Sequence, residues 1–174
     1  MTNAWKMLIK PERVNYSEDC LGPQLMELNN CNSKRVDFCF INNRGNRVQC
    51  SLFTPHPIGS NESSSDHSSV KLDCPVVVYC HSQSGNRVEG LFLQRTLLEE
   101  GCALCLFDFA GCGKSEGEYV TLGWREADDL EQLVQLLTHK HSASRVVIWG
   151  RSMGAVTALH FARRNSFLIT SIVY

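Results

Sequence analysis

The residues best suited to chemistry form the run Gly-Arg-Ser-Met-Gly, in which Ser152 stands between Gly150 and Gly154. This G-x-S-x-G pattern follows an apolar run at 145–149 and precedes a helix-like run at 153–164. A sharp turn from a strand into a helix strains the backbone, and small flanking residues allow it to form. Such a turn exposes a serine hydroxyl at its tip, so Ser152 is a candidate nucleophile for acyl transfer.

The same turn would leave the backbone N–H of Met153 without a partner at the start of a helix. An N–H in this place points at the oxygen that becomes negative during acyl transfer. A second donor is expected from the loop at 81–86, because loops that follow parallel strands meet at one edge of the sheet. The N–H of Ser82 or of Gln83 could supply it. His81 is interpreted as a strand-end histidine held by backbone groups.

Composition and charge exclude several other classes of protein. The 174 residues carry a formal net charge of −1 and are 43% hydrophobic, which fits one globular domain. No basic stripe indicates a nucleic-acid partner, and no apolar run reaches the roughly 18 residues of a membrane span. The first residues lack the apolar core of a secretory signal. We therefore expect a cytoplasmic protein without a transmembrane segment, a nucleic-acid partner or a cofactor.

The nine cysteines do not form a recognisable disulfide or metal framework. Their number is odd and most lie in apolar, strand-like runs, so we expect buried, reduced thiols. Cys102 and Cys105 form a C-x-x-C pair, but residues three apart on a strand face opposite sides. His56 and His67 lack further ligands at matching spacing. We predict no metal site.

A second run of interest, Gly-Cys-Gly-Lys-Ser at 111–115, resembles the end of a phosphate-binding loop. Such a loop needs a glycine at the position that Asp108 occupies, so nucleotide binding is not expected. Asp108 is instead predicted to accept hydrogen bonds from the N–H groups of the following loop.

The elements that must position these residues alternate along the chain. Strands are expected at 76–80, 102–107, 145–149 and 168–174, and helices at 87–100, 124–137 and 153–164. A hairpin at 35–41 and 48–53 precedes them. This order predicts an α/β fold with a doubly wound, mostly parallel sheet and an N-terminal antiparallel hairpin. Residues 1–33 are expected to form an irregular arm with a short helix near 24–28, and the serine-rich segment 55–73 a flexible loop.

Four motifs in this order resemble the α/β-hydrolase superfamily. They are His81-x-x-Ser84-Gly85-x-Arg87, Asp108-Phe-x-Gly111-x-Gly113-x-Ser115-x-Gly117, Tyr119-Val-Thr-Leu-Gly123-Trp and Trp149-Gly-Arg-Ser152-Met-Gly154. Within it the chain is similar to the serine aminopeptidase-like group and to acyl-protein thioesterases that remove palmitate. The resemblance implies Ser152 as nucleophile, with the N–H groups of Gln83 and Met153 as oxyanion donors. It also implies a small-molecule or acyl-protein substrate with an ester, thioester or amide bond. The family pattern has a glycine where this chain has Ser82.

The resemblance further implies an acid and a histidine on later loops, and these positions are absent from the 22 residues that follow Ser152. His160 is eight residues beyond Ser152, so it lies roughly 12 Å away along the same helix. His139 and His141 are interpreted as solvated loop histidines. We therefore expect residues 1–174 to be a single, incomplete hydrolase domain. The alternatives are a catalytically inactive binding protein and a split enzyme that takes its acid and histidine from another chain.

Overall fold

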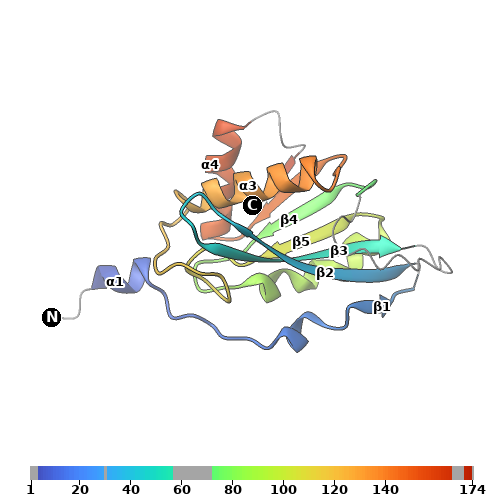
Figure 1. Cartoon of the computed structure of the whole chain (residues 1–174), viewed down its shortest axis with the longest axis horizontal. Helices are drawn as coiled ribbons and strands as arrows, with labels where there is room; N and C mark the ends of the chain where they lie inside the picture. Colours follow the sequence, from blue (N-terminus) through green and yellow to red (C-terminus); the bar gives the residue numbers. More distant parts are fainter. Residues whose placement is uncertain (1–3, 30, 57–71, 166–170, 174) are drawn as a thin grey trace.

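The computed structural model describes residues 4–29, 31–56, 72–165 and 171–173. Strands of these residues form one mixed sheet (Figure 1). They are β1 (Leu25–Glu27), β2 (Asn32–Ile41), β3 (Arg47–His56), β4 (Val76–Cys80), β5 (Ala103–Phe107), β6 (Val146–Gly150) and β7 (Ser171–Val173). Their order across the sheet is β1-β2-β3-β5-β4-β6-β7. The strands β1, β2, β3 and β5 pair antiparallel, whereas β5, β4, β6 and β7 pair parallel. The predicted α/β fold with an N-terminal antiparallel hairpin is confirmed.

Helices cover both faces of the parallel part of the sheet (Figure 1). One face carries η2 (Arg87–Leu93) and α2 (Gln94–Glu99), and the other carries α3 (Glu126–His139) and α4 (Met153–Arg164). Alternate residues of β4 enter the two cores: Val78 packs on the α3–α4 side, whereas Tyr79 packs on the η2–α2 side. Burial on both faces explains why β4 and β5 are continuous apolar runs. None of the helices in the described parts of the chain is long and apolar enough to cross a bilayer.

The N-terminal arm contains α1 (Ala4–Ile9), the 3-10 turn η1 (Glu18–Leu21) and β1. The prediction of a short helix near 24–28 is wrong, because these residues form an edge strand. Leu25 lies opposite Lys34 of β2, and the Arg35 N–H donates to the Gln24 carbonyl at 2.6 Å. Short apolar runs fit a helix or a strand equally well, and here pairing with β2 decides the outcome.

Several element boundaries differ from the predictions for local reasons. The strand β3 continues to His56 and takes the first residues of the predicted flexible loop at 55–73, of which 57–71 lie outside the described residues. The predicted helix at 87–100 begins as a 3-10 helix around Gly90. A Cβ on this glycine would lie 2.5 Å from the Leu106 side chain, so the segment approaches the sheet too closely for any side chain there.

The helix predicted at 124–137 begins two residues later, at Glu126. The buried carboxylate of Glu126 accepts hydrogen bonds from the N–H groups of Thr121 and Gly123 at 2.8 and 2.9 Å. It therefore holds the preceding residues in a turn. By contrast, α4 has the predicted bounds. Of the strand predicted at 168–174, β7 is the part that the structure describes, and it pairs with β6 in parallel.

Candidate active site

Ser152 lies in a sharp turn between β6 and α4. Its backbone has φ 52° and ψ −115°, a strained conformation that costs on the order of 1–3 kcal/mol. The Arg151 N–H donates to the Cys80 carbonyl at 3.0 Å, which fixes the turn against the end of β4. Ser152 is exposed. The turn therefore presents this serine to solvent at the carboxyl edge of the parallel strands.

Two glycines make the close packing of this turn possible. A Cβ on Gly150 would lie 2.5 Å from the Gly154 carbonyl oxygen. A Cβ on Gly154 would lie 1.9 Å from the Cys80 carbonyl oxygen, which is part of the neighbouring strand. Because both obstacles are backbone atoms, neither can move aside, and only glycine fits at either position.

The backbone N–H groups of Met153 and Gln83 form no hydrogen bond with another described residue. The N–H of Met153 stands at the start of α4, where no earlier turn of helix can accept it. Of the two donors that the sequence left open, Ser82 already gives its N–H to Glu89 at 3.1 Å. Gln83 is thus the residue of the pair with an unengaged N–H. Its side chain donates to the Leu8 carbonyl of α1.

Glu89, which the sequence analysis missed, joins the loop at 81–86 to the turn that carries Ser152. Its carboxylate accepts hydrogen bonds from the Tyr79 hydroxyl at 2.9 Å and the Ser82 hydroxyl at 2.7 Å. The Arg151 guanidinium lies 3.7 Å away. Burial opposes ionisation of Glu89, but the hydrogen bonds from Ser82 and Tyr79 outweigh it and lower the pKa of the carboxyl. Glu89 is therefore held as a carboxylate.

A cavity of about 430 Å³ opens beside Ser152 on the η2 side of the sheet. Tyr79, Phe92 and Trp149 line it, and Glu89 lies at its wall. The Phe92 ring meets the other two rings edge-on, with centroids 5.8 Å from Tyr79 and 6.3 Å from Trp149. An apolar group of a bound molecule could occupy this space next to the serine hydroxyl.

His81, which directly follows β4, is not available as a base. Its Nε2 accepts the Phe109 N–H at 3.0 Å, and its Nδ1 lies 2.6 Å from the Ser82 carbonyl oxygen. The side chain is fully buried, and burial lowers its pKa. Both ring nitrogens are thus used within the fold, as the sequence analysis expected. His81 holds the loop instead of taking a proton.

The other described histidines lie away from Ser152. His160 packs edge-on against Trp124 with ring centres 5.7 Å apart. The interpretation of His141 as a solvated loop residue is wrong, because it is buried and its ring lies 5.7 Å from that of Phe38. His139 is exposed at the end of α3, as expected. His56 ends β3, and the antiparallel pairing of β3 with β5 puts it at the amino edge of the parallel strands. Within the described residues, no histidine side chain is therefore placed to activate the serine.

A buried cluster of charged residues, Asp108 and Arg87, lies next to the loop at 81–86. Asp108 accepts hydrogen bonds from the Lys114 N–H at 2.9 Å, the Arg87 N–H at 2.6 Å and the Tyr16 hydroxyl at 2.6 Å. Its predicted role as an acceptor for the following loop is confirmed. The Arg87 side chain is almost fully buried and donates to the Cys50 carbonyl at 3.2 Å. These partners satisfy the buried charges.

The N-terminal arm fastens the loop that follows β5. Arg13 donates to the Ser115 carbonyl at 2.6 Å and also to the Gly117 carbonyl. Lys10 pairs with Glu118 at 2.6 Å. The arm thus lies across the carboxyl edge of the sheet, at the same edge as Ser152, an arrangement that the sequence analysis did not predict.

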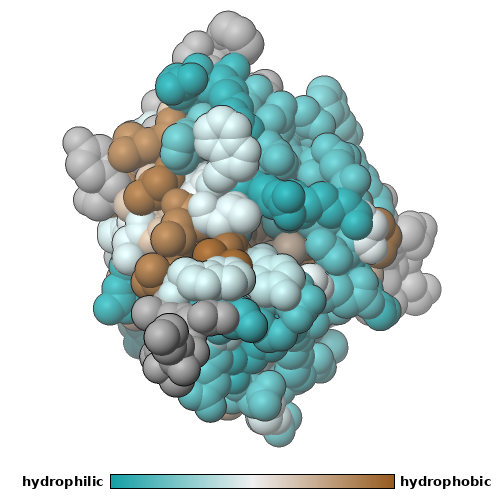
Figure 2. All heavy atoms as spheres, turned by 90° about the vertical axis from the view of Figure 1, so that its left-hand side faces the viewer, coloured by the Kyte–Doolittle hydropathy of each residue, from teal (hydrophilic) through white to brown (hydrophobic). Residues whose placement is uncertain are grey.

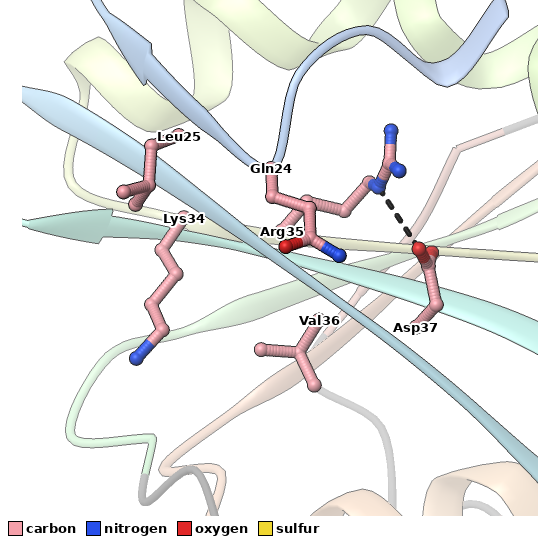
Figure 3. Close-up of a pocket in the computed structure, with 6 residues that line it drawn as sticks. All are labelled: Gln24, Leu25, Lys34, Arg35, Val36 and Asp37. Carbon is pink, nitrogen blue, oxygen red and sulfur yellow. Dashed lines mark hydrogen bonds and ion pairs between the residues drawn. The ribbon is translucent and has the colours of Figure 1, made fainter. Parts of the chain in front are cut away.

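A second cavity, of about 410 Å³, lies at the β1–β2 edge (Figure 3). The Arg35 Nε lies 3.1 Å from the Asp37 carboxylate, the pair joined by a dashed line in Figure 3. Asp37 also accepts the Ser51 hydroxyl at 2.5 Å, and Arg35 donates to the Gly22 carbonyl. Arg35 thus helps to hold the arm on the sheet, and the Asp37 carboxylate is already engaged.

The mixed sheet, the helices on both its faces and a serine in a strained strand-to-helix turn define an α/β-hydrolase fold. Residues 72–174, more than half of the chain, match the family described as serine aminopeptidase, S33. The chain belongs to this family, as the sequence resemblance predicted.

Individual proteins show the same relationship. The uncharacterized protein YqkD of Bacillus subtilis is 34% identical over 87 residues, which are 49% of this chain and 28% of that protein. The esterase Pf2001 of Pyrococcus furiosus matches with a TM-score of 0.63 and 23% identity, over 93% of this chain and 56% of the esterase. XC6422 of Xanthomonas campestris, an α/β serine hydrolase without lid, matches with a TM-score of 0.57 and 19% identity. That match covers 81% of this chain and 59% of XC6422. This chain thus spans little more than half of these solved structures.

Proposed function

We propose that this chain carries the nucleophile and the oxyanion site of a serine hydrolase. The observation that supports the proposal most is the strained turn at Ser152; the N–H groups of Met153 and Gln83, which have no partner among the described residues, are the donors we assign to the oxyanion. Backbone strain persists where the surrounding structure maintains it, and it concentrates at sites of function. An exposed serine followed by a free N–H at the start of a helix matches what acyl transfer requires.

In the proposed reaction the Ser152 Oγ attacks the carbonyl carbon of an ester, thioester or amide. The carbonyl oxygen becomes an oxyanion, which accepts hydrogen bonds from the N–H groups of Gln83 and Met153. Loss of the alcohol, thiol or amine leaves an acyl-serine, which water then hydrolyses. One oxyanion donor contributes roughly 3–4 kcal/mol of transition-state stabilisation in comparable enzymes. The serine proton must pass to a histidine that is oriented by an acid.

We infer that this histidine and acid lie outside the residues that the structure describes. His81 is fully engaged, and the other described histidines lie elsewhere on the fold. Without a base, a serine is a weak nucleophile, and such sites retain only about 10³–10⁴-fold catalysis over water. The described residues would therefore supply the nucleophile and the oxyanion donors. The histidine and the acid would come from the same polypeptide or from another one.

The substrate we propose is a small molecule or an acylated protein. The aromatic cavity beside Ser152 suits an apolar acyl or leaving group, and the solved relative from Pyrococcus furiosus is an esterase. We also propose that the protein works in the cytoplasm, because all nine cysteines are free and five of them are buried. Reduced, buried thiols are typical of reducing compartments.

A second candidate function, a catalytically inactive binding protein, is favoured by the absence of a usable histidine among the described residues. One experiment separates the two. The protein would be isolated from its source with an antibody against the described fold and assayed with p-nitrophenyl butyrate, a palmitoyl thioester and an aminoacyl anilide. The hydrolase proposal predicts turnover of at least one substrate and loss of turnover in the Ser152→Ala protein. Equal rates for the wild-type and Ser152→Ala proteins would contradict it.

A further inference from the structure

A row of apolar side chains is exposed at the carboxyl edge of the sheet, around the site of Ser152. Its members are Trp5, Leu8, Leu122, Trp124, Val156 and Leu159, each between 41 and 59% exposed. We call this set the apolar stripe. Figure 2 looks onto this edge and shows hydrophobic atoms gathered in a band beside pale aromatic rings. Contiguous exposed apolar patches on a folded protein mark interaction sites.

The stripe comes from three parts of the chain that contact one another. The Val120 N–H donates to the Ile9 carbonyl at 2.7 Å, which joins α1 to the loop before α3. That loop presses on α4, since a Cβ on Gly123 would lie 2.6 Å from the Val156 side chain. The end of α1 also contacts the loop at 81–86, because the Gln83 side chain donates to the Leu8 carbonyl. The stripe and the candidate active site therefore share one surface.

One member of the stripe is held in a strained backbone conformation. Leu122 has φ 53°, a region that costs a leucine on the order of 1–2 kcal/mol, and its side chain is 41% exposed. Burial of Leu122 does not offset this strain. A strained residue that presents an apolar side chain to solvent points to a function for that surface.

Cations accompany the aromatic residues on this surface. The cation–ring pairs are Lys6 with Trp5, Lys10 with Tyr119 and Arg164 with Trp124, at 5.7, 5.6 and 5.0 Å from the ring centres. Lys10 and Arg164 also pair with acids, Glu118 and Asp128. In the described part of the chain, Lys6, Arg125 and Arg163 are exposed and form no salt bridge. Arg163 follows Val156 by seven residues and so lies on the same face of α4. The stripe thus has a positive rim.

We propose that the apolar stripe docks on an anionic lipid bilayer. Tryptophan and leucine side chains enter the boundary between headgroups and acyl chains, and flanking lysine and arginine side chains bind anionic headgroups. A second copy of the chain would bring one positive rim against another across a two-fold axis, which disfavours self-association. The inference does not depend on the proposed hydrolase activity. If both hold, docking would place Ser152 beside acyl groups at the membrane surface.

The test is flotation of the full chain with vesicles of phosphatidylcholine alone and with one-third phosphatidylserine. Binding is expected only with the anionic vesicles. Replacing Leu8 and Trp124 by serine should weaken binding by at least about tenfold, because both side chains leave the interface. The matched control replaces Leu25 and Ile41 by serine; these residues are 70 and 61% exposed but lie outside the stripe. The control should bind as the wild type does.

The positive rim is tested separately. Changing Lys6 and Arg163 to alanine should weaken binding by about fivefold for each cation removed, and high salt should have a similar effect. All variants alter exposed side chains, and circular dichroism would establish that each is folded. The proposal is overturned if the wild type stays unbound, if it binds neutral vesicles equally well, or if the control variant loses binding as well. It is also overturned if ultracentrifugation shows that the stripe variants abolish a dimer and leave vesicle binding unchanged.

Discussion

Glu89 binds Ser82 through two hydrogen bonds, accepting the Ser82 N–H at 3.1 Å and the Ser82 hydroxyl at 2.7 Å. The two bonds fix the residue that precedes Gln83, whose own N–H stays unengaged. Where the family pattern has a glycine, this chain therefore has a serine whose side chain is anchored. The Ser82–Glu89 pair keeps the loop in place next to the turn at Ser152.

Removal of the Ser82 hydroxyl should destabilise the fold. Ser82→Ala deletes a hydrogen bond to a charged, mostly buried acceptor, and such bonds contribute about 1.5–3 kcal/mol. The free energy of unfolding from urea titration should fall by that amount. Ser144→Ala, at an exposed serine, is the matched control and should stay within about 0.5 kcal/mol of the wild type. Equal effects of the two substitutions would contradict the anchoring role.

The Glu89 carboxyl also predicts a pH dependence. Its pKa is lowered below the ordinary 4.5 in the folded chain, so the carboxylate stabilises the fold at higher pH. This contribution is fully present above about pH 4.5 and is lost as the pH falls through the lowered pKa. In Glu89→Gln the stability deficit relative to the wild type should therefore be largest at neutral pH and shrink in acid. A deficit that is constant from neutral pH to pH 3 would contradict this account.

Substitution of Gly154 should destabilise the fold far more than substitution of a glycine that is required only for its positive φ. Gly154→Ala would place a Cβ 1.9 Å from the Cys80 carbonyl oxygen, and we expect a loss of at least about 3 kcal/mol. Gly45 has φ +79° with open space around it, so Gly45→Ala should cost only about 1–2 kcal/mol. Thermal unfolding of both variants would compare them. Similar melting temperatures for the two variants would contradict the close packing of Gly154 in the turn at Ser152.

The Tyr16 hydroxyl should matter because it joins two buried charges. It donates to Asp108 at 2.6 Å and accepts a hydrogen bond from the Arg87 side chain. Tyr16→Phe leaves both groups short of a partner, which should lower the unfolding free energy by about 2 kcal/mol. Tyr119 is half exposed, and Tyr119→Phe serves as the control with a change below about 0.5 kcal/mol. Comparable losses in both variants would count against the buried network.

The elements that the sequence predicted well are those with local signals. The β4 and β5 runs are apolar because both faces of the sheet are covered, and α4 follows directly from the turn at Ser152. The prediction failed where contacts over long separations decide. The segment around Leu25 forms a strand only because β2 lies beside it. His141 is buried because Phe38, about a hundred positions earlier, packs against it.

The candidate site was likewise predictable only where local sequence signals determine it. Ser152 and its two glycines were visible as a pattern, because the turn needs these residue types at fixed spacing. Glu89 stood in no motif, although it binds Tyr79 and Ser82, ten and seven residues away. Arg13 contacts Ser115 across 102 residues, and no neighbouring residue indicates that contact. Spacing within a motif indicates a candidate nucleophile, whereas the groups around it depend on the tertiary fold.

The most direct test of the central claim is the site of reaction with a fluorophosphonate. The protein isolated from its source would be treated with the probe, digested with trypsin and analysed by mass spectrometry. An activated Ser152 should displace fluoride from phosphorus, so the adduct is expected on the peptide 152–163, in which Ser152 is the single serine. An adduct on another residue, or no adduct while other serine hydrolases in the same extract react, would contradict the account.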